Sequence, residues 1–344
     1  MSFRRSRLAI VVGCWLLGAC VAIAPEPESP EELSAWSSVT VGVRDLDSAL
    51  ELWIGTFGFN VAKLNEGPDE NVARLWGLAA SDIARQALVR TGDSQHGMVH
   101  FVEFNDPALP VRHGAQVYDL VPKNLDVYVD DMPRRFAELK ADGKRFRTDS
   151  FSEVTAPDGT AFREIHMPSH DDVNVVLLEV IGKPRPFTVR GFAGVGPLIF
   201  IVPDAPAEKV FFADVMQLDK LTDNLFKGPE IERMVGLPPG AGLDVSIWGR
   251  EGNDFGEIEI IEYQGVRGND LYPLAKPKAL GVLHISYVVD ELHSLLSRLE
   301  ARGVTVNDHG FVRTMSGEGR VISFQSPAGL RIEVYDRGSS PNNQ

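Results

Sequence analysis

The sequence contains almost no cysteine. Cys14 and Cys20 are the only two in 344 residues, and both fall within the first twenty positions. The rest of the chain therefore has no disulfide, no thiol nucleophile and no thiolate ligand for a metal ion. A metal site in this part of the chain would have to use histidine and carboxylate ligands.

Positive charge is scarce as well. Lysine and arginine number 34 against 48 aspartates and glutamates, which gives a formal net charge of -14. An acidic surface repels phosphate backbones, and no stripe of basic residues with interleaved aromatics offsets it. The composition therefore argues against a nucleic-acid partner. The sequence also lacks a glycine-rich phosphate loop, an H-E-x-x-H motif and a nucleophile elbow.

Residues 1–19 have the three parts of an export signal. Three arginines come first, an apolar run follows at residues 8–17, and small residues close the segment. The apolar run is too short to be a good membrane span. The letters Leu-Gly-Ala-Cys, which end at Cys20, resemble the lipobox of bacterial lipoproteins, where the cysteine becomes the lipidated first residue of the mature chain. An ordinary cleaved signal peptide that happens to contain Cys20 is the alternative.

The lipobox resemblance implies a location. A lipid on Cys20 would anchor the protein in a bacterial cell envelope. Residue 21 is not the aspartate that would suggest retention at the inner membrane, so we expect the periplasmic face of the outer membrane. Residues 20–35 are rich in Pro, Glu and Ser, which is typical of a tether between an anchor and a folded part.

The remainder of the chain repeats itself. Residues 124–146 align without a gap on residues 284–306, and residues 39–59 resemble residues 198–218. Each segment contains an apolar strand followed by an amphipathic helix. Short strands and hairpin turns come after each of them. The pattern predicts four units, each made of one strand, one helix and three more strands.

The four units predict an α+β fold built as two similar halves. We expect one domain of two βαβββ units at residues 36–181 and a second at residues 192–337, with a tail at 338–344. Residues 182–191 carry two prolines that interrupt the pattern, which is typical of a linker. The alternative is a single large α+β domain with coincidental internal similarity.

This arrangement resembles the vicinal oxygen chelate superfamily, which includes glyoxalase I, extradiol dioxygenases and drug-resistance proteins. The likeness covers residues 36–336. It is most specific in GVLHISYVVDELHSLLSRLEARG (281–303) and VISFQSPAGLRIEVYD (321–336). The resemblance implies tandem paired-module domains in which two units form a curved sheet around a cleft. It also implies that the first and last strands of each unit supply the ligands of a divalent metal ion.

The resemblance implies eight ligand positions in this sequence. The first-strand positions are Val39, Asn124, Leu198 and His284, and the last-strand positions are Glu103, Glu179, Glu262 and Glu333. In the second half this leaves His284, Glu262 and Glu333, a set suited to Zn, Mn, Fe or Ni, with Leu198 where a further ligand is expected. The first half lacks both imidazoles and is interpreted as a structural or lid-like copy.

Two main hypotheses of function follow. In the first, a membrane-anchored enzyme holds a divalent metal through His284, Glu262 and Glu333, with Glu262 and Glu333 catalytic. The metal acts as a Lewis acid on a small oxygen-bearing substrate in the cleft of the second domain, for lyase, isomerase or oxygenase chemistry. In the second, a metal-free protein binds or sequesters a small molecule in a cleft, as resistance proteins of the superfamily do. A structural lipoprotein with decayed sites is a third option.

Each candidate residue also has a purely structural explanation. A lone histidine on an apolar strand, such as His284, is often a packed core residue. Duplication copies a glutamate whether or not each copy is still used. The pairs His166 with His170, and His96 with His100, are explained as well by hairpin loops as by metal ligation.

Overall fold

The computed structural model describes residue 33 and residues 35–339. The predicted export signal, Cys20 and most of the predicted tether lie outside the described residues. Among the described residues, no helix is both long and apolar enough to cross a membrane.

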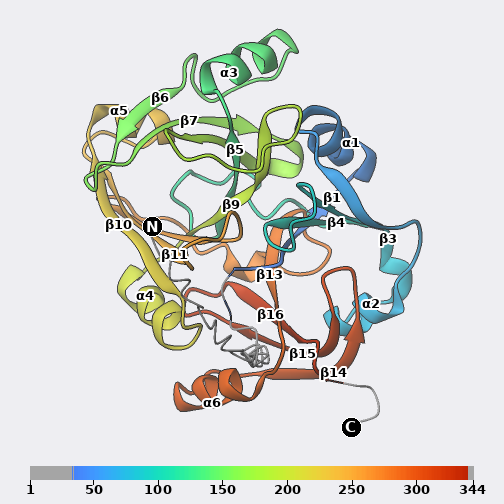
Figure 1. Ribbon diagram of the computed structural model, residues 1–344. Helices are drawn as coiled ribbons and strands as arrows, with labels where there is room; N and C mark the ends of the chain where they lie inside the picture. Colours follow the sequence, from blue (N-terminus) through green and yellow to red (C-terminus); the bar gives the residue numbers. More distant parts are fainter. Residues whose placement is uncertain (1–32, 34, 340–344) are drawn as a thin grey trace, which may run out of the picture.

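The strands form two eight-stranded sheets (Figure 1). The first sheet has the order β14-β15-β16-β13-β1-β4-β3-β2, and the second has the order β10-β11-β12-β9-β5-β8-β7-β6. The strands of the first sheet are β1 (Ser38–Val43), β2 (Asn60–Asn65), β3 (Ile83–Arg90), β4 (Met98–Phe104), β13 (Gly281–Val289), β14 (Asn307–Arg313), β15 (Glu318–Gln325) and β16 (Arg331–Asp336). Those of the second are β5 (Pro122–Val129), β6 (Ser152–Thr155), β7 (Ala161–Pro168), β8 (Asn174–Val180), β9 (Phe192–Ile201), β10 (Asp219–Lys227), β11 (Gly242–Gly249) and β12 (Ile258–Gln264).

Helices follow the first strand of each unit and lie on the outside of the sheets (Figure 1). The helices are α1 (Leu46–Leu50), which continues into the π-helical turn η1 (Glu51–Thr56), α2 (Glu70–Trp76), α3 (Met132–Ala141), α4 (Ala205–Asp214), α5 (Pro229–Val235) and α6 (His293–Ala301). Two further helices are not part of the βαβββ pattern: α2 follows β2 in the first unit, and α5 follows β10 in the third. The predicted α+β fold of four βαβββ units in paired sheets is confirmed.

The pairing of the units differs from the one expected. The first sheet combines the first unit with the fourth, through antiparallel β1 and β13, and the second sheet combines the second unit with the third, through antiparallel β5 and β9. Each of the halves 36–181 and 192–337 therefore contributes one unit to each sheet. As a consequence, the inner face around His284 is completed by the first unit and not by the third.

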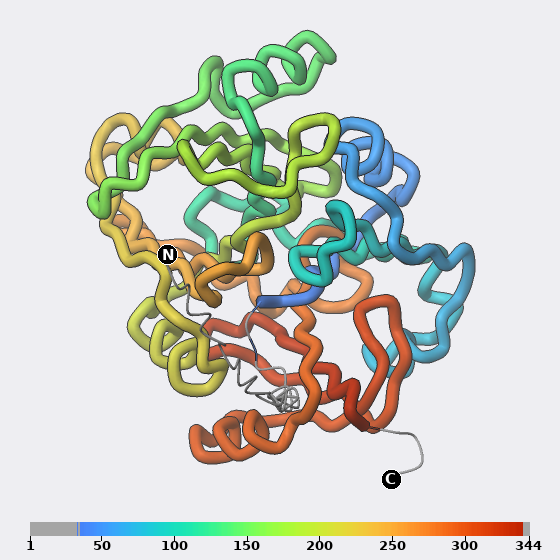
Figure 2. The backbone as a smooth tube through the Cα atoms, viewed as in Figure 1, coloured from blue at the N-terminus to red at the C-terminus, as the bar shows by residue number. Residues whose placement is uncertain are grey.

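The long connections explain this pairing. Residues 105–121 and 265–280 carry the chain from one sheet to the other and back, whereas the short linker 182–191 keeps the second and third units in one sheet. The two connections run beside each other, held by parallel bridges between Pro110 and Leu280 and between Leu120 and Asp270 (Figure 2). An apolar core that includes residues from both sheets joins them into one body.

Candidate functional site

The structure brings His284 and Glu333 together but not Glu262. His284 lies on β13 and Glu333 on β16, both fully buried on the inner face of the first sheet, with 3.5 Å between Nε2 and Oε2. Glu262 lies on β12 in the second sheet. Its Oε2 accepts a hydrogen bond from the backbone N–H of Ala205, the first residue of α4, at 2.8 Å.

Glu262 is one of three glutamates whose carboxylate accepts a hydrogen bond from the first backbone N–H of a helix. Glu103 accepts from the N–H of Leu46 at 2.9 Å, and Glu179 accepts from the N–H of Met132 at 3.0 Å. Like Ala205, these are the first residues of their helices. The first N–H groups of a helix lack partners within it and carry positive charge, so a carboxylate there stabilises the helix. The repeated glutamate is thus a structural feature of the unit.

Glu333 is not the fourth member of that set. In the sheet, Val43 lies opposite Glu103, and the corresponding Val289 lies opposite Asp336. Glu333 precedes Asp336 by three residues, and side chains alternate between faces along a strand, so Glu333 points to the inner face. The predicted alignment of Glu333 with the other three glutamates was therefore wrong, because Asp336 occupies their position. The error of three residues places the side chain of Glu333 on the opposite face of the sheet.

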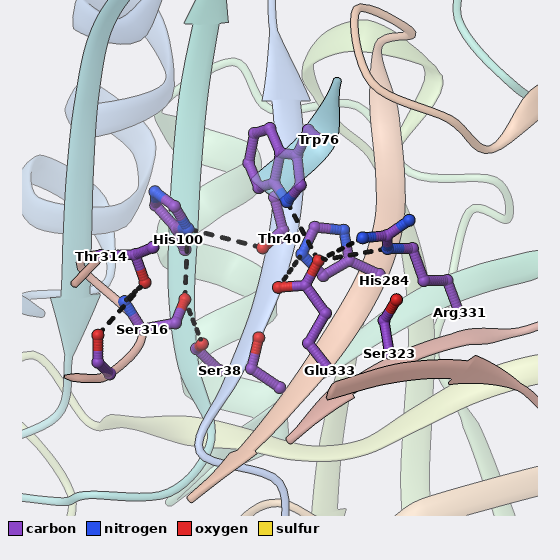
Figure 3. A network of polar contacts seen from close by, with 12 residues as sticks. Ser38, Thr40, Trp76, His100, His284, Thr314, Ser316, Ser323, Arg331 and Glu333 are labelled. Atoms are coloured by element: carbon purple, nitrogen blue, oxygen red, sulfur yellow. Dashed lines mark hydrogen bonds and ion pairs between the residues drawn. The ribbon is translucent and has the colours of Figure 1, made fainter. Parts of the chain in front are cut away.

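Glu333 lies within a ring of hydrogen-bond donors (Figure 3). Its Oε1 accepts from Trp76 Nε1 at 3.0 Å and from Arg331 Nε and Nη2 at 3.1 and 2.9 Å. The Tyr335 hydroxyl donates to Oε2 at 3.3 Å. Burial alone would raise the pKa of Glu333, but His284 and Arg331 outweigh burial and hold this pKa well below its usual value.

His100 is the residue of this face that the sequence analysis did not select. It lies on β4, opposite Thr40, as Glu333 lies opposite Ser286. Its Nε2 is 2.9 Å from Gln86 Oε1, and its Nδ1 lies near the hydroxyl groups of Thr40 and Ser316 (Figure 3). Burial lowers the pKa of His100 to about 3, so the ring is neutral at neutral pH. Alternation along β4 was the available signal, since it separates His100 from Glu103.

These side chains do not fit the divalent metal ion that the resemblance implies. Within residues 33 and 35–339, no three His, Cys, Asp or Glu side chains are placed to hold a metal ion together. Glu333 already accepts three N–H groups on Oε1, and the Arg331 guanidinium brings a positive charge to the same oxygen. His100 is hydrogen-bonded to Gln86. A cation at Oε1 would have to displace these donors, and one at Oε2 would have only His284 as a second ligand among the described residues.

The inner face of the second sheet holds a cavity of about 210 Å³. Its walls are mostly apolar and come from both units of the sheet and from α5. The apolar lining includes Phe162, Leu178, Ile199, Phe226, Ile231, Leu243 and Val245. We call this space the second-sheet cavity.

Several ionisable side chains also line the second-sheet cavity. Asp126 and Glu257 are 4% and 6% exposed, and each has one carboxylate oxygen without a hydrogen-bond partner. Burial, reinforced by neighbouring carboxylates, raises the pKa of Asp126 well above its usual value and that of Glu259 to about 8. Burial also raises the pKa of Glu257 to about 7 and lowers that of Lys123 to about 7.

The sequence analysis did not identify this cluster. Glu257 and Glu259 occupy alternate positions of an apolar strand, and Asp126 is in the middle of another, so one face of each strand carries acid where core residues are expected. Perturbed ionisable groups gather at functional sites more often than elsewhere. The second-sheet cavity is therefore the better candidate site.

Sequence comparison identifies no relative, because no family model and no curated protein matches the chain. Several solved structures, in contrast, resemble the structure of this chain. Glyoxalase I from Zea mays is 11% identical, with a TM-score of 0.57 over 88% of this chain and 92% of that one. A variant of the same enzyme gives 13% identity and a TM-score of 0.60 over 88% and 92%.

The fold is glyoxalase-like. A proposed dioxygenase from Bacillus subtilis supports this assignment with 12% identity and a TM-score of 0.57 over 90% of this chain and 87% of that one. The expected vicinal oxygen chelate fold is confirmed by these neighbours. At such low identity a glyoxalase-like fold says nothing about activity, so function is argued from the site.

Proposed function

We propose that this protein binds a small organic molecule, without a metal ion, in the second-sheet cavity. The observation that carries the proposal is a pair of buried carboxyl groups, Asp126 and Glu257, that line an apolar cavity and each have one oxygen without a hydrogen-bond partner. A buried polar atom without a partner costs roughly 1 to 3 kcal/mol. A ligand that hydrogen-bonds to these groups would offset that cost.

The contrast between the two sheets supports this choice. On the first sheet, Glu333 is surrounded by Trp76, Arg331 and Tyr335, so its charge is compensated within the protein. On the second sheet, no such donors reach Asp126 or Glu257 among the described residues. The carboxylate of Glu333 is thus satisfied within the protein, although His284 Nε2 beside it has no hydrogen-bond partner. The unpartnered carboxyl oxygens of the second sheet lie beside a cavity that has room for a ligand.

The size of the cavity limits the ligand. An apolar cavity of about 150 Å³ is enough to bind benzene. A volume of about 210 Å³ therefore accommodates one ring with a short substituent. The proposal corresponds to the second of the two main functions expected from the sequence, a metal-free binding or sequestering protein. The metalloenzyme has less support, because Glu262 lies apart from His284 and Glu333.

Thermal unfolding of the folded region in the presence of a chelator tests the proposal. Soluble aromatic alcohols and amines that enter the cavity should raise the unfolding temperature in proportion to the logarithm of their concentration. Val245→Phe fills the cavity and should abolish the shift, whereas Val210→Phe, at an exposed position of α4, should leave it intact. Equal shifts for Val245→Phe and the unmodified protein would contradict binding at this site.

The same measurement, repeated with added metal ions and no chelator, can favour the metalloenzyme. In that case Zn, Mn, Fe or Ni ions would raise the unfolding temperature while the organic compounds would not. The metal effect would persist in Val245→Phe and disappear in His284→Ala. This outcome would refute the binding proposal.

We also propose that the chain is exported and held by a lipid on Cys20 at the periplasmic face of an outer membrane. The leader sequence alone supports this part of the proposal. Expression of the full chain in a bacterium fed labelled palmitate should label the protein and place it in the membrane fraction. Cys20→Ala should remove the label, and a label retained in this variant would refute the anchor.

A further inference from the structure

We infer that the ligand of the second-sheet cavity is a cation, an amine or guanidine on a small apolar body, and that it binds by displacing protons from Asp126 and Glu259. This inference rests on the proposed binding function of the same cavity. It goes further by assigning the charge of the ligand and the groups that recognise it.

The first argument is an inventory of charge around the cavity. The ionisable side chains around Asp126 and Glu259 come from β5, β7 and β12 and from the flanking loops, while β8, β9 and β11 contribute apolar side chains to the lining. The ionisable ones are Lys123, Asp126 and Tyr128 on β5, Glu164 and His166 on β7, Glu257 just before β12, Glu259 and Tyr263 on β12, and Asp158, Lys183 and Arg185 in the flanking loops, with Arg112 and Arg147 close to Lys123 and Tyr263. Carboxyl groups outnumber bases on the strands themselves.

The bases on the cavity wall already have partners. Lys123 donates from Nζ to the hydroxyl of Tyr263 at 2.9 Å. His166 Nε2 lies 2.9 Å from Glu164 Oε1. The guanidinium of Arg185 lies over the Tyr128 ring at 3.5 Å from the centroid. Lys123 and His166 are therefore occupied in the absence of a ligand, whereas Arg185 stacks on Tyr128 and keeps its buried Nε–H without a hydrogen-bond partner.

Two carboxyl groups of the cavity have an oxygen without a partner. Asp126 Oδ1 and Glu257 Oε2 are buried without a hydrogen bond, and Glu259 is half-buried on the wall of the same cavity. The unpartnered carboxyl oxygens at the cavity, Asp126 Oδ1 and Glu257 Oε2, thus outnumber the one unpartnered N–H among the described residues there, Arg185 Nε. A neutral ligand would match the walls but would not stabilise the ionised form of the carboxyl groups, and an anion would oppose their ionisation.

Burial determines the protonation of these groups. Desolvation raises the pKa of Glu259 to about 8, with Glu164 adding to the effect and Lys123 opposing it. Desolvation also raises the pKa of Asp126, together with Glu259 and Glu164. Glu259 thus retains its proton to a large extent at neutral pH, and Asp126 holds its proton more tightly than an exposed aspartate does. An opposite charge within about 4 to 6 Å lowers a carboxyl pKa by about 1 to 3, so a bound cation ionises them and protons leave to solvent.

Two probes separate charge from shape. Benzylamine and benzyl alcohol have nearly the same size, and only the amine is cationic. Isothermal titration calorimetry in phosphate and in Tris, buffers with different ionisation heats, should show benzylamine binding about tenfold or more tightly than benzyl alcohol, with release of up to about one proton. Benzylamine affinity should fall as the pH is lowered from about 8 to about 6, because protons compete for the same carboxyls.

Asp126→Asn and Glu259→Gln should each reduce the preference for the amine and the number of protons released. Glu251→Gln, an exposed substitution of the same type, should change neither. The variants replace a carboxyl by an amide of nearly equal size, and their unfolding temperatures report whether the fold is kept.

The possible results distinguish the two proposals. If benzyl alcohol binds as tightly as benzylamine, and Val245→Phe blocks both, the cation is refuted while the binding function stands. If benzylamine binds more tightly but with equal heats in the two buffers, proton displacement is refuted. If neither probe nor any other aromatic compound binds, both the inference and the proposed function fail.

Discussion

Glu208 provides a test of how burial controls ionisation in this protein. It lies on α4 and is fully buried. Its Oε1 accepts hydrogen bonds from the hydroxyl of Ser326 and the backbone N–H of Ala328, in the turn between β15 and β16, and its Oε2 has no partner in the described structure. Burial raises the pKa of Glu208 from 4.5 to about 7, although the two hydrogen bonds oppose the shift.

The direction of the pH effect follows from this pKa. The folded state binds the proton of Glu208 more tightly than the unfolded chain does, so the stabilisation it provides is fully present below about pH 4.5. It is lost as the pH rises to about 7 and changes little above that. A difference between 4.5 and about 7, at about 1.4 kcal/mol per pH unit, gives a loss of about 3 kcal/mol.

Glu208→Gln removes this titration while keeping an acceptor oxygen for Ser326 and Ala328. At about pH 5 the variant and the unmodified protein should have similar free energies of unfolding. At about pH 8 the variant should be more stable by about 3 kcal/mol. Denaturant unfolding at both pH values measures the difference, and Glu251→Gln at an exposed site is the matched control. If the difference between Glu208→Gln and the unmodified protein does not change with pH, the reasoning from burial is wrong.

Further predictions concern the inner and outer faces of the sheets. Glu262→Ala should lower the free energy of unfolding by about 1 kcal/mol through loss of the carboxylate at the start of α4, measured by denaturant unfolding; no loss would contradict the helix-holding role. Glu333→Gln should cost about 3 to 5 kcal/mol in the same assay, because it removes the carboxylate paired with the Arg331 guanidinium, whereas a metal-ligand role alone would leave the metal-free protein unaffected. Gly42→Ala should prevent normal folding, seen by circular dichroism, since its Cβ would lie 2.1 Å from the carbonyl oxygen of Ala279; a native spectrum would show that this approach can relax.

The units were predictable from the sequence because they repeat. Residues 124–146 and 284–306 share strand, helix and glycine positions, and each forms the expected strand and helix. The pairing of units was not predictable in the same way. It depends on the connections 105–121 and 265–280, which have no repeating pattern and whose bridges form only in the folded chain.

The candidate site was predictable only in part. His284 and Glu333 stand out because polar residues interrupt apolar strands, and the structure places them together. Glu262 was grouped with them because Glu262 and Glu333 were aligned as equivalent positions of two units. An alignment error of an odd number of residues assigns a side chain to the wrong face of its strand. Asp126 and Glu259 were overlooked because the resemblance directed attention to other positions. Their significance depends on packing, which buries Asp126 Oδ1 without a partner and places Glu259 on the wall of the same cavity.

The pairing of the first unit with the fourth affects the order in which the protein can be completed. The second sheet uses a continuous stretch, residues 122–264, so its two units can join as soon as that stretch is available. The first sheet requires β1, at the start of the folded part, to meet β13 and β16 near its end. Contacts between such distant segments form slowly. The edge of β1 that pairs with β13 therefore stays unpaired until most of the chain has been synthesised. A chain that ends before β13 has an open strand edge, which favours association with other chains.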